Sequence, residues 1–90
     1  MEIIFSPQAK EDLKYWKATG NKAIQQKIEK LLIAIEQDPY RGIGKPEQLK
    51  HNLAGTWSRR ITKEHRMVYE INHKNQIIIL DILSLKRHYY

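Results

Sequence analysis

The chain has 90 residues, of which 41% are hydrophobic and 29% charged, a composition typical of one small globular domain spanning residues 1–90. It contains no cysteine, which excludes disulfides, thiol catalysis, thiolate zinc sites and iron–sulfur clusters. No apolar run approaches the roughly 20 residues that span a membrane, and no signal peptide is visible. Sixteen Lys and Arg against ten Asp and Glu give a net charge of +6, which favours an anionic partner. We therefore expect a cytoplasmic protein that acts on nucleic acid, on an acidic protein, or on both.

The positive charge is concentrated in the second half of the chain. Residues 1–45 carry eight basic and six acidic side chains, whereas residues 46–90 carry eight and four. All four histidines also lie in the second half. The first half thus has the pattern of a scaffold and the second that of a working surface.

The first half predicts a strand followed by two helices. Residues 2–5 are a short apolar strand candidate. Ser6 is a suitable N-cap and Pro7 a suitable first residue for a helix that ends at Thr19–Asn21. A second helix is expected over Lys22–Asp38 because apolar residues recur there at helical spacing: Ile24, Ile28, Leu31, Leu32 and Ile35.

The second half predicts a loop followed by three strands. Two Gly and two Pro make residues 39–49 a loop. Residues 56–62, 65–71 and 76–84 have strand-like composition, with a hairpin turn at 72–75. The order is strand, helix, helix, strand, strand, strand. This order predicts an α+β fold in which two N-terminal helices pack on a small, mostly antiparallel sheet.

Side-chain alternation predicts the two faces of this sheet. With a tight connection at residues 61–65, Arg60 lies directly opposite Arg66. The more polar face is expected to meet solvent and carries Thr56, Ser58, Arg60, Arg66, Val68 and Glu70. The more apolar face is expected to meet the helices and carries Trp57, Arg59, Ile61, His65, Met67, Tyr69 and Ile71.

The residues available for chemistry are Glu, His, Arg, Lys and Tyr. The sequence has no phosphate-binding glycine loop, no nucleophile elbow and no histidine spacing typical of a metal site, so no metal or cofactor is expected. These side chains suffice for RNA cleavage, because RNA supplies its own 2′-hydroxyl nucleophile. The protein then needs a base, an acid and cations that stabilise the charged transition state.

Three segments resemble the YoeB (Txe) family of ribosome-dependent mRNA endonuclease toxins, part of the RelE superfamily. Residues 44–53 read GKPEQLKHNL, residues 55–62 read GTWSRRIT, and residues 64–69 read EHRMVY. The stretch 6–16 and the closing His88–Tyr89 fit as well, so the resemblance covers essentially the whole chain. It implies a RelE-like toxin fold, with helices against a curved antiparallel sheet.

The resemblance also assigns roles to matching positions. Glu47 corresponds to the general base that activates the 2′-hydroxyl, and His88 to the general acid that protonates the leaving 5′-oxygen. Arg66 corresponds to the arginine that stabilises the transition-state phosphate. Arg60 and Lys50 correspond to further phosphate contacts.

The C-terminus departs from the family pattern. The family commonly ends Arg-Tyr-His-Tyr, whereas residues 86–90 here read KRHYY. A tyrosine near the end orients the nucleotide in the family. Tyr89 matches that position and Tyr90 is an extra residue, so both are candidates for this role.

The family implies a toxin of a type II toxin–antitoxin system that cleaves mRNA in the ribosomal A site by 2′-hydroxyl transesterification without a metal. It further implies a YefM/Phd-type antitoxin, DNA contacts made through the antitoxin complex, and a homodimer. The alternatives are a non-catalytic ParE-like toxin that binds DNA gyrase and a plain ribosome- or RNA-binding module. The joint presence of Glu47, Arg66 and His88 favours the enzyme, because a binder would not need all three.

Overall fold

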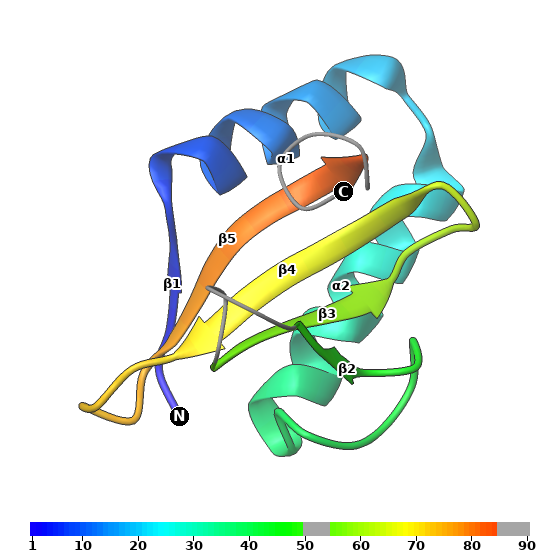
Figure 1. Cartoon of the computed structure of the whole chain (residues 1–90). Coiled ribbons are helices and arrows are strands. Elements are labelled where there is room, and N and C mark those ends of the chain that lie inside the picture. The colour runs from blue at the N-terminus through cyan, green and yellow to red at the C-terminus, as the bar shows by residue number, and fades with distance from the viewer. Residues whose placement is uncertain (50–54, 85–90) are drawn as a thin grey trace.

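The computed structural model describes residues 1–49 and 55–84, which form two helices and a five-stranded sheet (Figure 1). The elements are β1 (Ile3–Phe5), α1 (Pro7–Thr19), α2 (Lys22–Gln37), β2 (Glu47–Gln48), β3 (Thr56–Arg60), β4 (His65–Ile71) and β5 (Ile77–Ser84). The strand order across the sheet is β1-β5-β4-β3-β2. β1 runs parallel to β5 and the other neighbours are antiparallel, which confirms the predicted α+β class and mostly antiparallel sheet.

Both helices begin where the sequence predicts. The Ser6 side chain accepts a hydrogen bond from the Ala9 amide, and Pro7 occupies the first turn of α1. Gly20 ends α1 in the left-handed conformation, with φ of 71°. The Asn21 side chain then caps α2 by accepting from the Ile24 amide. Local capping chemistry therefore fixes three of the four helix ends.

The prediction of a continuous loop over residues 39–49 is wrong at Glu47–Gln48. These two residues form the edge strand β2, which pairs antiparallel with Ser58 and Trp57 of β3. A two-residue strand next to Pro46 has no alternation of its own to reveal it. Its formation depends on the neighbouring strand, and it places Glu47 on the sheet.

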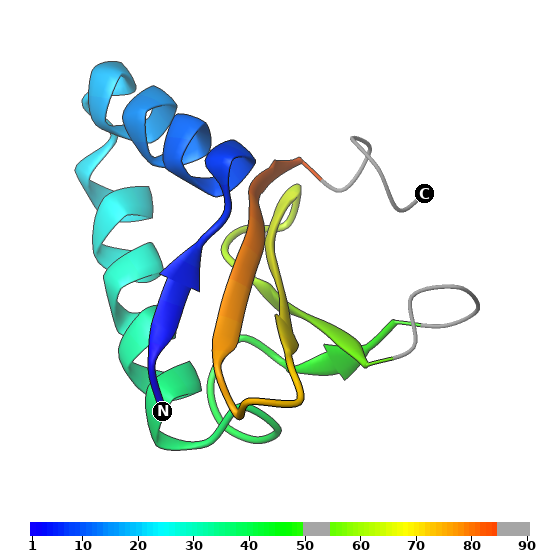
Figure 2. The same cartoon turned by 90° about the vertical axis from the view of Figure 1, so that its left-hand side faces the viewer.

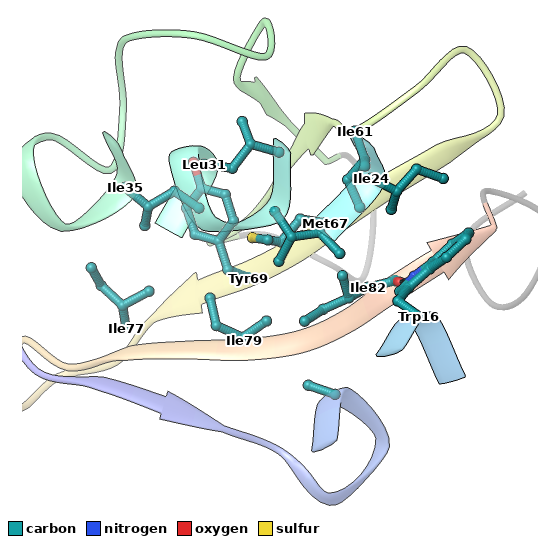
Figure 3. Close-up of a cluster of buried hydrophobic side chains, with 12 residues drawn as sticks. Trp16, Ile24, Leu31, Ile35, Ile61, Met67, Tyr69, Ile77, Ile79 and Ile82 are labelled. Carbon is teal, nitrogen blue, oxygen red and sulfur yellow. Dashed lines mark hydrogen bonds between the residues drawn. The ribbon is translucent and has the colours of Figure 1, made fainter. Parts of the chain in front are cut away.

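The two helices cover one face of the sheet, as Figure 2 shows from the side. Between them and the sheet lies a core of large apolar side chains (Figure 3). Helix α2 contributes Ile24, Ile28, Leu31 and Ile35, which is the predicted apolar stripe without Leu32, and Leu32 is only partly buried. The strands contribute Met67, Tyr69, Ile77, Ile79 and Ile82, and the turn after β3 contributes Ile61.

Helix α1 also completes the edge of β5 beyond the end of β1. The pairing between β1 and β5 ends at Phe5 and Ile79. Further along, the Asp12 carboxylate accepts from the Ile82 amide at 2.9 Å, and the Trp16 indole donates to the Ile82 carbonyl at 2.6 Å. Two helical side chains thus satisfy backbone groups of the sheet that have no neighbouring strand on that side.

The predicted register of β3 and β4 is confirmed, but one predicted face is wrong. Arg60 pairs with Arg66, and Tyr69 and Met67 face the helices. The opposite face was expected to meet solvent, yet most of its members are buried: Thr56, Ser58, Arg66 and Val68. Alternation correctly separates the two faces, but it does not reveal that both of them are largely buried.

Candidate active site

The candidate site lies on the sheet face away from the helices. Glu47 of β2 stands opposite Ser58 of β3, Ser58 opposite Val68 of β4, and Val68 opposite Asp81 of β5. These four residues form one row across the sheet, with an acidic residue at each end, and Asp81 is buried. The next row on the same face contains the opposed residues Arg60 and Arg66.

Glu47 and Arg66 form an ion pair across this face. One Arg66 Nη atom lies 3.0 Å from Glu47 Oε2. The Arg66 side chain is 10% exposed and the Glu47 side chain 61% exposed. The guanidinium is therefore embedded in the protein, while the carboxylate that it holds is open to an incoming ligand.

Ser58 anchors the same Arg66 nitrogen from the strand between them. Its hydroxyl accepts from Arg66 Nη1 at 2.9 Å, and the Ser58 residue is fully buried. Within the described residues, the Nε atom of Arg66 is buried without a hydrogen-bond partner. One donor of the guanidinium therefore lacks an acceptor in the free protein, although it is shielded from solvent.

Arg60 adds a second cation beside Arg66. The two arginines are directly opposite partners on β3 and β4, and Arg60 is exposed. Like charges at directly opposite strand positions destabilise a sheet. A bound anion would relieve this repulsion, so the pair has the arrangement expected of a phosphate site.

Four of the predicted site residues lie outside the described part of the chain: Lys50, His88, Tyr89 and Tyr90. The structure thus brings together Glu47, Arg66 and Arg60. Lys50 immediately follows Leu49, whose amide donates to the Thr56 carbonyl. The last described residue, Ser84, pairs with His65 at the Arg66 end of β4.

Sequence reasoning missed the roles of Ser58 and Arg59. For Ser58 the signal was available, because alternation already placed it on the same face as both arginines. Arg59 was correctly assigned to the helix-facing side, but that side is apolar and no local pattern explains a cation there. Its explanation lies in the loop that precedes β2.

Arg59 is fully buried and binds the segment that leads to Glu47. Its Nη atoms donate to the backbone carbonyls of Asp38 (2.6 Å), Arg41 (2.9 Å) and Ile43 (3.1 Å). Its Nε donates to the Tyr69 hydroxyl at 3.0 Å. This guanidinium thus fastens the 38–43 segment to the strand beside β2.

Tyr69 completes the Arg59 network. Its hydroxyl donates to the Pro39 carbonyl at 2.6 Å, and its ring is buried in the core. Burial raises the pKa of the Tyr69 phenol, and the hydrogen bond from Arg59 opposes that rise only in part. The neutral phenol is therefore the form that the fold favours.

Within 1–49 and 55–84, no three His, Asp or Glu side chains gather in a group able to hold a metal ion. Neither of the helices described there is long and apolar enough to cross a membrane.

Comparison with known proteins places the chain in a family. Residues 5–89 match the family model described as the YoeB-like toxin of bacterial type II toxin–antitoxin systems. The toxin YoeB of Escherichia coli K12 is 46% identical over 78 residues, covering 87% of this chain and 92% of that protein.

Two solved structures from Staphylococcus aureus are also similar. The YoeB dimer has a TM-score of 0.82 at 46% identity, and the YoeB–YefM complex has a TM-score of 0.81 at 47% identity. Each alignment covers 93% of this chain and 95% of the other chain. The sequence match and the shared fold together establish that this chain belongs to the family of YoeB-like toxins of bacterial type II toxin–antitoxin systems.

Proposed function

We propose that this toxin is a ribosome-dependent endoribonuclease that cleaves mRNA in the A site. The observation that carries the proposal is the Glu47–Arg66 pair, flanked by the opposed cation of Arg60. One carboxylate and two guanidinium groups on a single sheet face supply a base and a phosphate clamp.

The proposed reaction is a transesterification within the RNA. Glu47 takes the proton of the 2′-hydroxyl, and the 2′-oxygen attacks the adjacent phosphorus. The bond from phosphorus to the 5′-oxygen breaks, and His88 gives its proton to that leaving oxygen. The products are a 2′,3′-cyclic phosphate and a free 5′-hydroxyl.

Arg66 and Arg60 stabilise the extra negative charge of the transition state. Arg66 is suited to this role because it is largely desolvated, and electrostatic interactions are stronger in such surroundings. Its bond to Glu47 must open as the RNA arrives, so that the carboxylate meets the 2′-hydroxyl and the guanidinium meets the phosphate. Ser58 keeps hold of the guanidinium during this exchange.

The proposal draws Lys50, His88, Tyr89 and Tyr90 into the same site. Lys50 adds a phosphate contact, and Tyr89 or Tyr90 orients the nucleotide.

The C-terminal segment begins near Arg66, because Ser84 pairs with His65, next to the pair Arg66–Leu83. His88 follows four positions later, a stretch that an extended chain covers in at most ~14 Å. The length of the C-terminal segment is therefore sufficient for His88 to act at the Arg66 end of the site.

We also propose a YefM-type antitoxin as the partner that neutralises the toxin. The S. aureus relative forms a YoeB–YefM complex, and this chain carries a net charge of +6, which suits an acidic partner segment. DNA contacts would then be made through the antitoxin complex. A homodimer is the corresponding proposal for the free toxin, by analogy with the S. aureus YoeB dimer.

The test is single-turnover cleavage of an end-labelled mRNA on programmed ribosomes. Glu47→Gln keeps an oxygen that can accept from Arg66 but removes the base, and His88→Ala removes the acid. We expect each to slow cleavage by about 100-fold or more while ribosome binding is retained. The matched controls are Glu64→Gln and His73→Ala, which alter an acid and a histidine in exposed turns.

Two outcomes would reject the enzymatic proposal. Cleavage by Glu47→Gln and His88→Ala at the wild-type rate would reject the assigned roles. Ribosome binding by the wild-type chain with no cut in the A-site codon would leave a non-catalytic toxin or RNA-binding module, and inhibition of DNA gyrase would then be measured.

A further inference from the structure

The 38–43 segment, which leads to β2 and Glu47, is attached to β3 through one buried cation. The guanidinium of Arg59 binds three backbone carbonyls between Asp38 and Ile43, and its Nε binds the Tyr69 hydroxyl. The Asp38 carbonyl belongs to the C-cap of α2, where the helix dipole favours a positive charge. The cation thus replaces the strand pairing that this irregular segment lacks.

Close packing continues from this anchor towards β2. The Arg60 amide donates to the Gly44 carbonyl at 2.7 Å. A Cβ atom at Gly44 would lie 2.7 Å from Leu31 Cδ2 and 3.1 Å from Arg59 Cβ, so the backbone passes directly over the Arg59 stem. Gly44 is therefore held against β3 by a hydrogen bond, with little space left around its Cα.

The next residue carries backbone strain. Lys45 has a positive φ of 49°, a conformation that non-glycine residues rarely adopt and that persists only where the surroundings enforce it. Lys45 lies two positions before Glu47. A strained turn therefore joins the segment that Arg59 anchors to the strand that bears Glu47.

We propose that Arg59 is a positioning residue for Glu47, with Tyr69 orienting the Arg59 guanidinium. This inference rests on the proposed endoribonuclease function. Arg59 touches neither Arg66 nor the open face, since it lies on the opposite side of β3. It acts by holding the 38–44 segment in place. That segment in turn fixes the register of β2, so that the Glu47 carboxylate meets Arg66.

The shape of the guanidinium is essential for this role. It donates from three nitrogens to four acceptors that come from both the loop and the core. A lysine in its place keeps the charge but has one nitrogen and no planar fork. Arg59→Lys is therefore the informative variant, and Tyr69→Phe is the milder one because it keeps the ring in the core.

The experiment measures single-turnover cleavage on programmed ribosomes for Arg59→Lys and Tyr69→Phe, each with Glu47 intact and with Glu47→Gln. Displacing a reacting group by ~1 Å costs about 100-fold in rate. With Glu47 intact we expect a loss of about 100-fold for Arg59→Lys and about tenfold for Tyr69→Phe, with ribosome binding unchanged. With Glu47→Gln, neither substitution should slow cleavage further.

A second readout does not depend on cleavage. The side-chain ¹H–¹⁵N resonances of Arg66 report its contact with Glu47 in the free protein. We expect Arg59→Lys to move them towards their positions in Glu47→Ala, whereas the matched control Arg41→Met should leave them in place. Arg41 is exposed in the same segment and is bound through its carbonyl.

The outcomes separate this inference from the proposed function. Wild-type rates and Arg66 resonances in both variants would overturn the positioning role. Equal losses with and without the Glu47 carboxylate would show that Arg59 acts only on stability. If the wild-type chain does not cleave, the proposed function fails, and the Arg66 resonances still decide whether Arg59 sets the position of Glu47. If Arg59→Lys does not fold, Tyr69→Phe decides by the same measurements.

Discussion

The Glu47 carboxylate on β2 and the Arg66 guanidinium on β4 lie 3.0 Å apart, although β3 separates their strands. The Arg66 side chain reaches across β3, where the Ser58 hydroxyl accepts a hydrogen bond from its Nη1 atom at 2.9 Å. The proposed base and the proposed phosphate-binding cation are therefore held together in the free protein.

Ser58 should affect cleavage through Arg66. Ser58→Ala removes an acceptor from a charged donor, an interaction worth about 1.5–3 kcal/mol. We expect the single-turnover rate to fall about tenfold or more while ribosome binding stays unchanged. Thr62→Ala is the matched hydroxyl deletion, because Thr62 accepts from amides in the turn between β3 and β4 and not from the site. Equal rates for Ser58→Ala and the wild type would contradict this support of Arg66.

Tyr69 should make the fold sensitive to alkali. Burial raises its pKa in the folded state, so the folded protein favours the neutral phenol. This contribution to stability is complete below the unfolded-state pKa of 10.0 and is lost as pH rises above it through the folded-state value. Urea midpoints measured from pH 8 to 11 should fall at the alkaline end.

Tyr69→Phe identifies the group responsible for that loss. The phenylalanine variant should start less stable at pH 8, because Arg59 Nε and the Pro39 carbonyl lose their partner. It should also lose less stability between pH 10 and 11 than the wild type does. Tyr15→Phe, at an exposed position, serves as the control. An unchanged alkaline slope in Tyr69→Phe would assign the effect to other groups.

Gly44 should tolerate no side chain. A Cβ there meets Leu31, Arg59 and the Arg60 carbonyl, in addition to the strain of a φ of +83°. Gly55→Ala is a matched control, because its φ is +87° and nothing lies within 4 Å of the added atom. We expect Gly44→Ala to lower the free energy of unfolding by about 1–3 kcal/mol more than Gly55→Ala does. Urea denaturation measures both, and equal losses would show that the loop relaxes around the methyl group.

Asp12 should hold the end of β5 to α1. Asp12 is 2% exposed, and its carboxylate accepts from the Ile82 amide. Asp12→Ala leaves that amide without its acceptor, and we expect a loss of about 1–3 kcal/mol with faster hydrogen exchange at Ile82. Asp12→Asn retains an acceptor oxygen and should lose less. Glu11→Ala, at an exposed position on the same helix, should change neither measurement.

The sequence by itself determined the features that depend on near neighbours. Ser6, Pro7, Gly20 and Asn21 set the helix ends because capping involves residues only a few positions apart. The alternation of β3 and β4 predicted the Arg60–Arg66 pair because a tight connection fixes the register. The family resemblance proposed Glu47 as the base, a choice that no local rule would have made over Glu64 or Glu70.

Tertiary structure alone decided the features that join distant segments. β2 exists because β3 offers it a neighbour, and the face around Ser58 is buried although most of its residues are polar. Arg59 lies in the core since a loop about 20 positions earlier turns its carbonyls inward to meet it. A sequence pattern records the surroundings of a residue along the chain. The partners of the buried Arg59 cation are distant along the chain, and so are Glu47 and Arg66. These residues meet only when the strands and the loop assemble in the folded protein.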